Sequence, residues 1–230
     1  MRILGPSLLF LSLLLSFTTH AQVSIGIKGG PDFSRIVNAV EGNDGSGNIG
    51  LLKSGTLTQY YGGVFVDIPL DSNTKMFYLR TGADFVGAGG NMNSTGDYYN
   101  GNGFQPGSKY TLHYVDVPLE FLYSPGFDWG RPWVGLGLYS GALVNGTIKT
   151  QGGSSESVMI GNKSNDNFQR FDFGYAFTMG LAIKAGFLFG LDYQHGFSRI
   201  VPDAQIQSPL TRLQTHNSVW GFHVGWVFKL

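Results

Sequence analysis

The sequence predicts an all-β fold, an eight-stranded antiparallel up-and-down transmembrane β-barrel, and three observations carry this prediction. Residues 170–184 alternate between large apolar and small side chains without interruption. Charged residues make up 13% of the chain, against roughly 25% in an average soluble protein. Long and short connections between the predicted strands alternate along the chain, as they do in barrels that cross a membrane.

The segment 170–184 has a period of two, which indicates a strand. One face carries only large apolar side chains: Phe171, Phe173, Tyr175, Phe177, Met179, Leu181 and Ile183. The other face is mostly Gly, Ala and Thr, with charges only at or near its ends. A half-buried strand of a soluble sheet usually presents polar side chains to water. At about 3.3 Å per residue this strand is long enough to cross a bilayer even when tilted.

Seven further segments show the same alternation. They are residues 23–33, 57–70, 76–87, 109–123, 132–145, 187–198 and 219–230. Two prolines lie in or at the end of these segments, Pro69 and Pro118, and each is interpreted as a bulge or a strand end because proline cannot donate to a ladder. Around His113 and Tyr114 the alternation blurs, so the register there is uncertain within two residues.

The connections give an independent test of the barrel. Long stretches rich in Gly, Asn and Ser occupy residues 34–56, 88–108, 146–169 and 199–214, and short ones residues 71–75, 124–131 and 184–186. With a periplasmic N-terminus, every long connection lies on the extracellular side of the membrane and every short one on the periplasmic side. A Greek-key sandwich has no reason to keep this parity.

The N-terminus has the features of a secretory signal peptide over residues 1–21, followed by a barrel domain over 22–230. Arg2 supplies a positive charge, residues 8–17 are apolar, and small residues precede Gln22. The alternative, a membrane anchor, requires roughly twenty apolar residues. After residue 21 no run of 18 apolar residues occurs, so a closed barrel is the remaining way to satisfy the backbone in lipid.

Composition excludes several functions. Without the signal the chain has 14 basic and 15 acidic residues, a net charge of −1, so no nucleic-acid partner is expected. The chain has no Cys, so it has neither disulfides nor thiolate chemistry. No GxSxG, HExxH, phosphate loop or paired metal ligands occur. No catalytic, cofactor-binding or metal-binding residue is therefore predicted, and no cofactor.

If the large apolar side chains face lipid, the opposite faces line the lumen. The charged residues predicted there form a polar network: Lys28, Asp67, Arg80, Asp84, Asp116 and Glu120. Asp32, Asp172, Lys184, Asp192, Gln194 and His223 share these faces. Arg80 and Asp84 lie on one strand and Asp116 and Glu120 on the next, so these four are expected to interact. Eight strands leave room only for side chains, so this network plugs the barrel.

Three alternatives stay open. The lumen could form a narrow porin-like channel or a proton path. The second alternative is an outer-membrane enzyme acting on lipid, because His113, His195 and His216 are predicted near the rim of the barrel. A soluble secreted barrel of lipocalin type, with apolar residues inside, is the third. The leading hypothesis is a non-catalytic barrel with a structural or binding role.

Loops on a rigid barrel are where specificity usually resides. Loop 88–108, with Tyr98, Tyr99 and Phe104, is the best candidate surface for a protein or glycan ligand. Aromatic residues near predicted strand ends are expected to form belts at the two lipid headgroup boundaries. They are Tyr60, Tyr61, Trp129, Trp133, Tyr139, Trp220 and Trp226.

Several segments together resemble the outer-membrane β-barrel proteins of Bacteroidetes, the PorT-like family. They are residues 26–34 (GIKGGPDFS), 114–121 (YVDVPLEF), 132–139 (PWVGLGLY), 172–174 (DFG) and 225–228 (GWVF). The resemblance implies an outer-membrane location and an eight-stranded barrel. The named member of the family is associated with secretion of cell-surface proteases, and an accessory role in secretion is retained here only as a hypothesis.

The closing strand is the expected signal for the barrel-assembly machinery, carried by Trp226, Phe228 and Leu230. Two residues depart from the family pattern. Glu120 stands where an aliphatic residue is more common, and Leu230 replaces the commoner terminal Phe. The expected partners are thus outer-membrane lipid, the assembly machinery and a loop ligand.

Overall fold

The computed structural model describes residues 23–41, 49–71, 73–92, 107–150, 152–163, 165–202 and 214–229. The predicted signal peptide, Leu230 and the loop aromatics Tyr98, Tyr99 and Phe104 lie outside the described residues.

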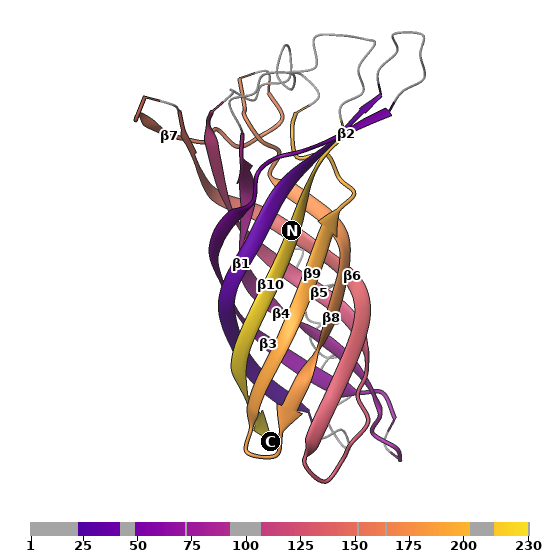
Figure 1. Ribbon diagram of the computed structural model, residues 1–230. Coiled ribbons are helices and arrows are strands. Elements are labelled where there is room, and N and C mark those ends of the chain that lie inside the picture. The colour runs from indigo at the N-terminus through magenta and orange to yellow at the C-terminus, as the bar shows by residue number, and fades with distance from the viewer. Residues whose placement is uncertain are drawn as a thin grey trace, which may run out of the picture.

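The described residues form one antiparallel sheet that closes on itself (Figure 1). Its strands are β1 (Ser24–Glu41), β2 (Ile49–Lys53), β3 (Leu57–Pro69), β4 (Phe77–Asn91), β5 (Lys109–Tyr123), β6 (Gly130–Lys149), β7 (Ser155–Ser157), β8 (Phe171–Ile183), β9 (Phe187–Gly196) and β10 (Gln214–Lys229). β10 pairs with β1 and closes the barrel, whereas β2 and β7 only extend β1 and β6 beyond it. The predicted eight-stranded antiparallel barrel is confirmed.

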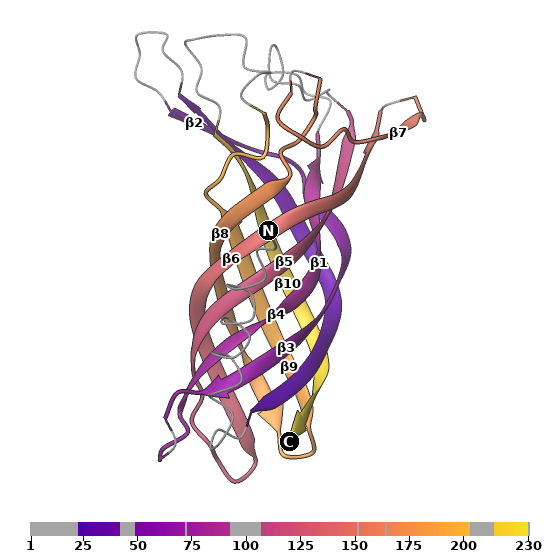
Figure 2. The same ribbon diagram turned by 180° about the vertical axis from the view of Figure 1, so that it is seen from behind.

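The barrel has a short-turn end and a long-loop end. The turns between β3 and β4, β5 and β6, and β8 and β9 gather at the end where the C-terminus lies, and the strand ends from which the long connections leave lie at the other (Figures 1 and 2). Asp71 closes the first short turn by accepting hydrogen bonds from the Thr74 hydroxyl and from the backbone N–H groups of Asn73 and Thr74, which lower the pKa of its carboxyl.

The stagger of the strands follows from the register. Arg35 of β1 has a partner on β10, which has a partner on β9, and so on from strand to strand around the barrel. This series of partners returns to β1 at Ile25, ten residues nearer the start of the strand. Such a stagger tilts the strands by roughly 40°. Each step from β1 to β10 to β9 therefore descends about 3 Å toward the short-turn end, given a strand spacing of about 4.8 Å.

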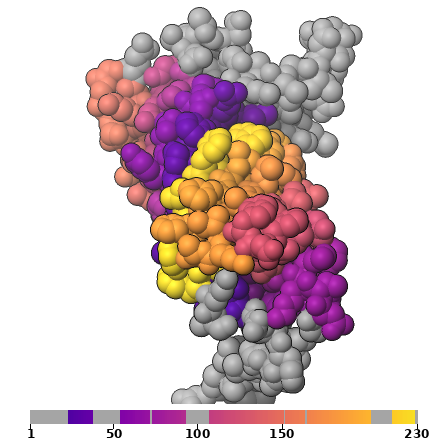
Figure 3. All heavy atoms as spheres, turned by 60° about the horizontal axis from the view of Figure 1, so that its bottom comes forward, coloured from indigo at the N-terminus to yellow at the C-terminus, as the bar shows by residue number. Residues whose placement is uncertain are grey.

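The outer wall is apolar. Large hydrophobic side chains cover it on every barrel strand, among them Ile27, Val64, Phe85, Val117, Leu136, Met179, Phe189 and Val224. On β8 the large side chains Phe171, Phe173, Tyr175 and Met179 are exposed, while Asp172, Ala176 and Thr178 are buried inside. Figure 3 shows β8 and β9 (orange) beside β10 (yellow) as one continuous wall. The barrel is therefore built with its apolar side outward, as the sequence predicted, and not as a lipocalin.

The small side chains of β8 accommodate aromatic rings inside the barrel. Gly180 pairs with Trp133 and Gly174 pairs with Tyr139 across β6 and β8. A Cβ atom on Gly180 would overlap the Trp133 ring and the Phe189 carbonyl oxygen. Trp133, Tyr139 and Tyr61 are thus buried in the lumen, and their assignment to the headgroup belts was wrong. Tyr60, Trp129 and Trp220 are exposed on the outside.

This packing gives a first prediction. Gly180→Leu should lower the free energy of unfolding by about 1–3 kcal/mol, because the new side chain overpacks the site. Urea unfolding of the refolded protein in lipid vesicles measures it. Gly126→Ala is the matched control, since a Cβ there has no atom within 4 Å. If both variants unfolded at the same urea concentration, the packing of Gly180 against Trp133 described here would be contradicted.

The two prolines differ from the expectation in one case. Pro69 ends β3, as predicted. Pro118 lies inside β5, where it pairs with Tyr139 of β6 without any change of register. On its other side the ladder to β4 is interrupted, and the Thr81 hydroxyl donates to the Pro118 carbonyl at 2.8 Å. Pro118 therefore marks neither a bulge nor a strand end.

The uncertain register near His113 and Tyr114 has a clear cause. The β5–β6 pairing shifts by one residue between these two positions, because Val144 of β6 is skipped between the partners Leu143 and Asn145. Within β5 itself the alternation continues, with Tyr114 buried and Val115 exposed. The irregularity belongs to β6.

Candidate functional site

The candidate site is the barrel interior, whose polar side chains form three layers. Nearest the short-turn end, Arg80 of β4 makes two hydrogen bonds to Asp67 of β3, at 2.7 and 2.9 Å. The guanidinium also lies over the rings of Phe65 and Trp133, 4.3 and 5.0 Å from their centroids. A bidentate pair held between aromatic faces is geometrically fixed.

The middle layer is centred on Lys28 of β1. Its Nζ atom lies 3.1 Å from Asp84 Oδ2 of β4 and 3.1 Å from Asp192 Oδ2 of β9. Tyr61 donates to Asp192 Oδ2 at 2.8 Å, and Thr178 donates to Asp192 Oδ1 at 2.6 Å. A buried ammonium thus joins carboxylates from two strands that are distant in sequence.

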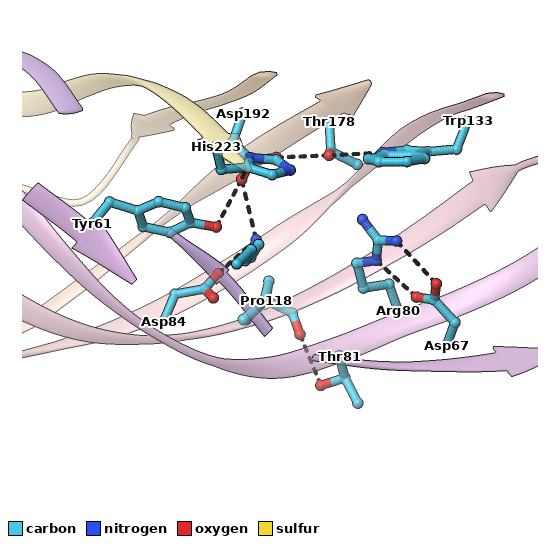
Figure 4. A network of polar contacts seen from close by, with 11 residues as sticks. Tyr61, Asp67, Arg80, Thr81, Asp84, Pro118, Trp133, Thr178, Asp192 and His223 are labelled. Carbon is cyan, nitrogen blue, oxygen red and sulfur yellow. Dashed lines mark hydrogen bonds and ion pairs between the residues drawn. The ribbon is translucent and has the colours of Figure 1, made fainter. Parts of the chain in front are cut away.

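Two aromatic groups complete the middle layer. His223 Nδ1 of β10 lies 3.2 Å from Asp192 Oδ2. The Trp133 indole donates to the Thr178 hydroxyl at 3.3 Å and stacks on His223, with ring centroids 6.5 Å apart (Figure 4). Asp192 therefore receives polar contacts from four different strands.

The third layer lies toward the long-loop end and surrounds Asp172 of β8. Its carboxylate accepts hydrogen bonds from Ser198 at 2.6 Å, Asn217 at 2.9 Å and Tyr139 at 3.3 Å. Nearby, Asp32 of β1 accepts from the Gly87 backbone N–H at 3.0 Å. Here hydroxyl, amide and backbone donors satisfy the carboxylates instead of cations.

The six residues predicted for the network all belong to the inner wall, but their pairing differs from the prediction. Arg80 lies opposite Glu120 in the β4–β5 register, yet its hydrogen bonds go to Asp67. Asp84 lies opposite Asp116 and pairs with Lys28 instead. Within the described residues, Asp116 Oδ1 and Glu120 Oε2 have no hydrogen-bond partner. The described ion pairs of Lys28 and Arg80 join β1 to β4 and β9, and β4 to β3, instead of joining β4 to β5.

A cavity of about 200 Å³ enters the barrel from the short-turn end. Arg131, Lys184, Tyr78 and Trp133 line it, and the Arg80–Asp67 pair also borders it. Arg131 lies over the Tyr78 ring and donates to the Lys75 and Ser124 carbonyl oxygens.

Above the third layer the interior becomes apolar, which the sequence did not predict. Buried side chains from the strands meet buried side chains from the long connections in one cluster, here called the cap cluster: Ile36, Val86, Tyr110, Leu112, Leu143, Val158, Phe168 and Ile200. Phe168 packs edge-on against Tyr110, with centroids 5.9 Å apart. The connections thus contribute a small hydrophobic core at the mouth of the barrel.

In the described part of the chain, the hydrogen bonds of the rim histidines go to a tyrosine hydroxyl and a backbone carbonyl oxygen, and not to a serine hydroxyl or a carboxylate. Among the described hydrogen bonds, His195 Nδ1 lies 3.5 Å from the Tyr193 hydroxyl, and His216 Nδ1 lies 2.8 Å from the Ser198 backbone carbonyl oxygen. His113 stacks on Phe85, with ring centroids 5.3 Å apart.

The closing strand presents its aromatic residues outward. Phe228 is exposed, and Trp226 packs against Phe187 of β9 with ring centroids 4.6 Å apart. Within the part of the chain that is described, no helix is long and apolar enough to span a membrane. The same residues contain no group of three or more side chains suited to hold a metal ion.

An apolar outer wall around a filled polar interior defines an integral membrane β-barrel. Residues 17–201 match the family described as "Outer membrane protein beta-barrel domain". The chain belongs to this family and is a barrel of the bacterial outer membrane.

Similar solved structures include barrels of several kinds. The chain is similar to neisserial surface protein A, with 11% identity and a TM-score of 0.43 over 90% of this chain and 97% of that one. It is similar to the N-terminal barrel domain of Pseudomonas aeruginosa OprF, with 12% identity and a TM-score of 0.37 over 90% and 99%. It is also similar to the outer membrane enzyme PagL, with 16% identity and a TM-score of 0.37 over 86% and 99%. No curated protein matches the chain.

Proposed function

We propose that this protein is a non-catalytic outer-membrane barrel with a closed lumen, which acts through contacts made at its long-loop end. In this proposal the short-turn end is periplasmic and the long-loop end extracellular. The carrying observation is that, beyond the cavity at the short-turn end, three polar layers and the cap cluster succeed one another along the described interior. A barrel filled in this way serves as a scaffold for what its outer end presents.

The geometry of the rim supports the absence of catalysis. A lipid-modifying enzyme of the serine type needs a histidine within hydrogen-bond reach of a nucleophile. The Ser198 hydroxyl donates to Asp172, and His216 contacts only the backbone carbonyl oxygen of Ser198. Ser218 lies 3.4 Å from the Tyr193 hydroxyl, which lies 3.5 Å from His195. A phenol between serine and imidazole, with long contacts on both sides, does not activate the serine.

We further propose that the protein is a PorT-like barrel of Bacteroidetes and supports the secretion of surface proteins. This finer assignment rests on the segments that resemble that family. Deletion of the gene in its host tests it, with the amount of surface-exposed protease as the readout. Unchanged secretion in the deletion strain would remove the secretion role and leave the closed barrel untouched.

A closed lumen predicts electrical silence. The refolded mature chain should give no discrete conductance steps in a planar bilayer, because Lys28, Asp84 and Asp192 are joined across the barrel and the cap cluster lies above them. Stepwise currents would instead favour the alternative that the protein is a narrow porin-like channel. Carboxyl groups outnumber basic groups on the described inner wall, so such a channel would select cations. A known porin inserted in the same bilayer serves as the positive control.

A further inference from the structure

The strands β1, β10 and β9 are neighbours in the barrel wall (Figure 1). A groove of about 410 Å³ lies on the outer side of these strands. Phe33 and Arg35 of β1, Tyr193 of β9, Ser218 and Trp220 of β10, and Thr56 line it. The lower part of the groove is aromatic, since Tyr193 and Trp220 pack with ring centroids 4.4 Å apart. The upper part carries one cation and hydroxyl groups.

The register places this groove at the boundary of the apolar band. Arg35 pairs with Ser218, and two residues lower Phe33 pairs with Trp220, which pairs with Tyr193. From this aromatic row to the short-turn end, the outward positions of β1, β9 and β10 described here carry no charged side chain. Just above the row, Ile36 belongs to the cap cluster inside. Arg35 thus marks the height at which the hydrocarbon layer ends.

The guanidinium of Arg35 is held in place, and no carboxylate whose side chain is described compensates its charge. Its Nε atom donates to Thr56 Oγ1 at 2.7 Å, which leaves the terminal amino groups for another acceptor. The side chain is exposed, and none of the described carboxylates forms an ion pair with it. A fixed guanidinium presents parallel N–H donors that match the oxygens of a phosphate.

We propose that this groove binds one phosphorylated lipid of the outer leaflet, with the phosphate on Arg35 and Ser218 and an acyl chain along Trp220 and Phe33. The occupant is a lipid because the aromatic half of the groove faces the hydrocarbon layer while the cation stands at the headgroup level. The inference rests on the proposed orientation, in which this end of the barrel is extracellular.

Native mass spectrometry of the refolded mature chain in detergent tests the proposal, and it does so independently of orientation. The probes are diphosphorylated lipid A and the same lipid with both phosphates removed. The wild-type barrel should bind the phosphorylated form roughly tenfold more tightly, as expected for one charge-assisted contact. Arg35→Gln should abolish this preference. Arg35→Lys should keep part of it, because the charge remains without the planar donor pair.

Arg170→Gln is the matched control, because Arg170 is also exposed near the long-loop end and lies outside the groove. If Arg35→Gln does not refold, Thr56→Val serves as the second variant. It removes the hydrogen bond that fixes the Arg35 guanidinium and should by itself weaken the preference for the phosphorylated lipid. Equal affinity of the wild-type chain for both lipids overturns the proposal, and so does an unchanged preference in Arg35→Gln. A lipid-free dimer that Arg35→Gln converts to a monomer would assign the groove to a second copy of the chain instead.

Discussion

Lys28→Met should lower the free energy of unfolding by about 3–5 kcal/mol, the usual cost of removing one partner from a buried ion pair. Lys28 is buried and lies 3.1 Å from both Asp84 Oδ2 and Asp192 Oδ2. Methionine fills a similar volume, so little of the loss comes from packing. The loss arises because two carboxylates remain buried without their cation. Urea unfolding in lipid vesicles, followed by the shift of the folded band on an unheated gel, measures it.

The compensated variant separates charge from shape. Lys28→Met combined with Asp84→Asn and Asp192→Asn should recover most of the lost stability, because the two side chains that Lys28 contacted then carry no charge. Lys109→Met, at an exposed position at the start of β5, should change the free energy of unfolding by no more than about 0.5 kcal/mol. A single Lys28→Met variant as stable as the Lys109→Met control would contradict the central role of Lys28.

The membrane-spanning part of the barrel could be predicted from the sequence because a single rule governs it. Apolar side chains face out and small or polar ones face in, so a period of two identifies both the strand and its faces, as in β8 from Phe171 to Ile183. The same parity assigned Lys28 and Arg80 to the lumen.

The long-loop end could not be predicted because the rule inverts there. Above the lipid, water surrounds the wall and the interior holds an apolar core. Arg35 therefore faces out while Ile36 faces in, and Lys109 faces out while Tyr110 faces in. The alternation of apolar side chains on the outer face stops at residue 33, so the sequence predicts that the first strand ends there. In the structure β1 continues to Glu41. The same inversion explains why β4, β6 and β10 run further toward this end than expected.

The ion pairs inside the lumen could not be predicted from the sequence for a different reason. Lys28 and Asp192 are separated by 164 residues, and only the closure of the barrel through β10 and β1 brings their strands together. The sequence gives the face of each side chain but not the stagger. Which lumen residues meet depends on the ten-residue offset accumulated around the barrel. Neighbouring strands suggested that Arg80 and Asp84 of one strand interact with Asp116 and Glu120 of the next. The structure instead joins Asp84 to Lys28 of β1, which β3 separates from β4 in the sheet.

Phe168→Ala should open the cap cluster while leaving the barrel folded. Phe168 is 1% exposed and packs on Tyr110, and truncating a buried phenylalanine costs about 3–5 kcal/mol. The loss should appear in the local stability of the mouth, because the connections there are held by apolar burial while the barrel is held by a closed ladder of hydrogen bonds. Hydrogen exchange of the backbone amides measures the difference.

Two amides report on the mouth directly, since Gly161 donates to the Phe168 carbonyl at 2.9 Å and Gln169 to the Ile200 carbonyl at 2.7 Å. Both should lose protection in Phe168→Ala and keep it in Met159→Ala, whose side chain in the same connection is exposed. Amides of β8 and β9 should exchange as in the wild type. If they also lost protection, the mouth and the barrel would form one cooperative unit, and the cap cluster would be part of what holds the strands closed.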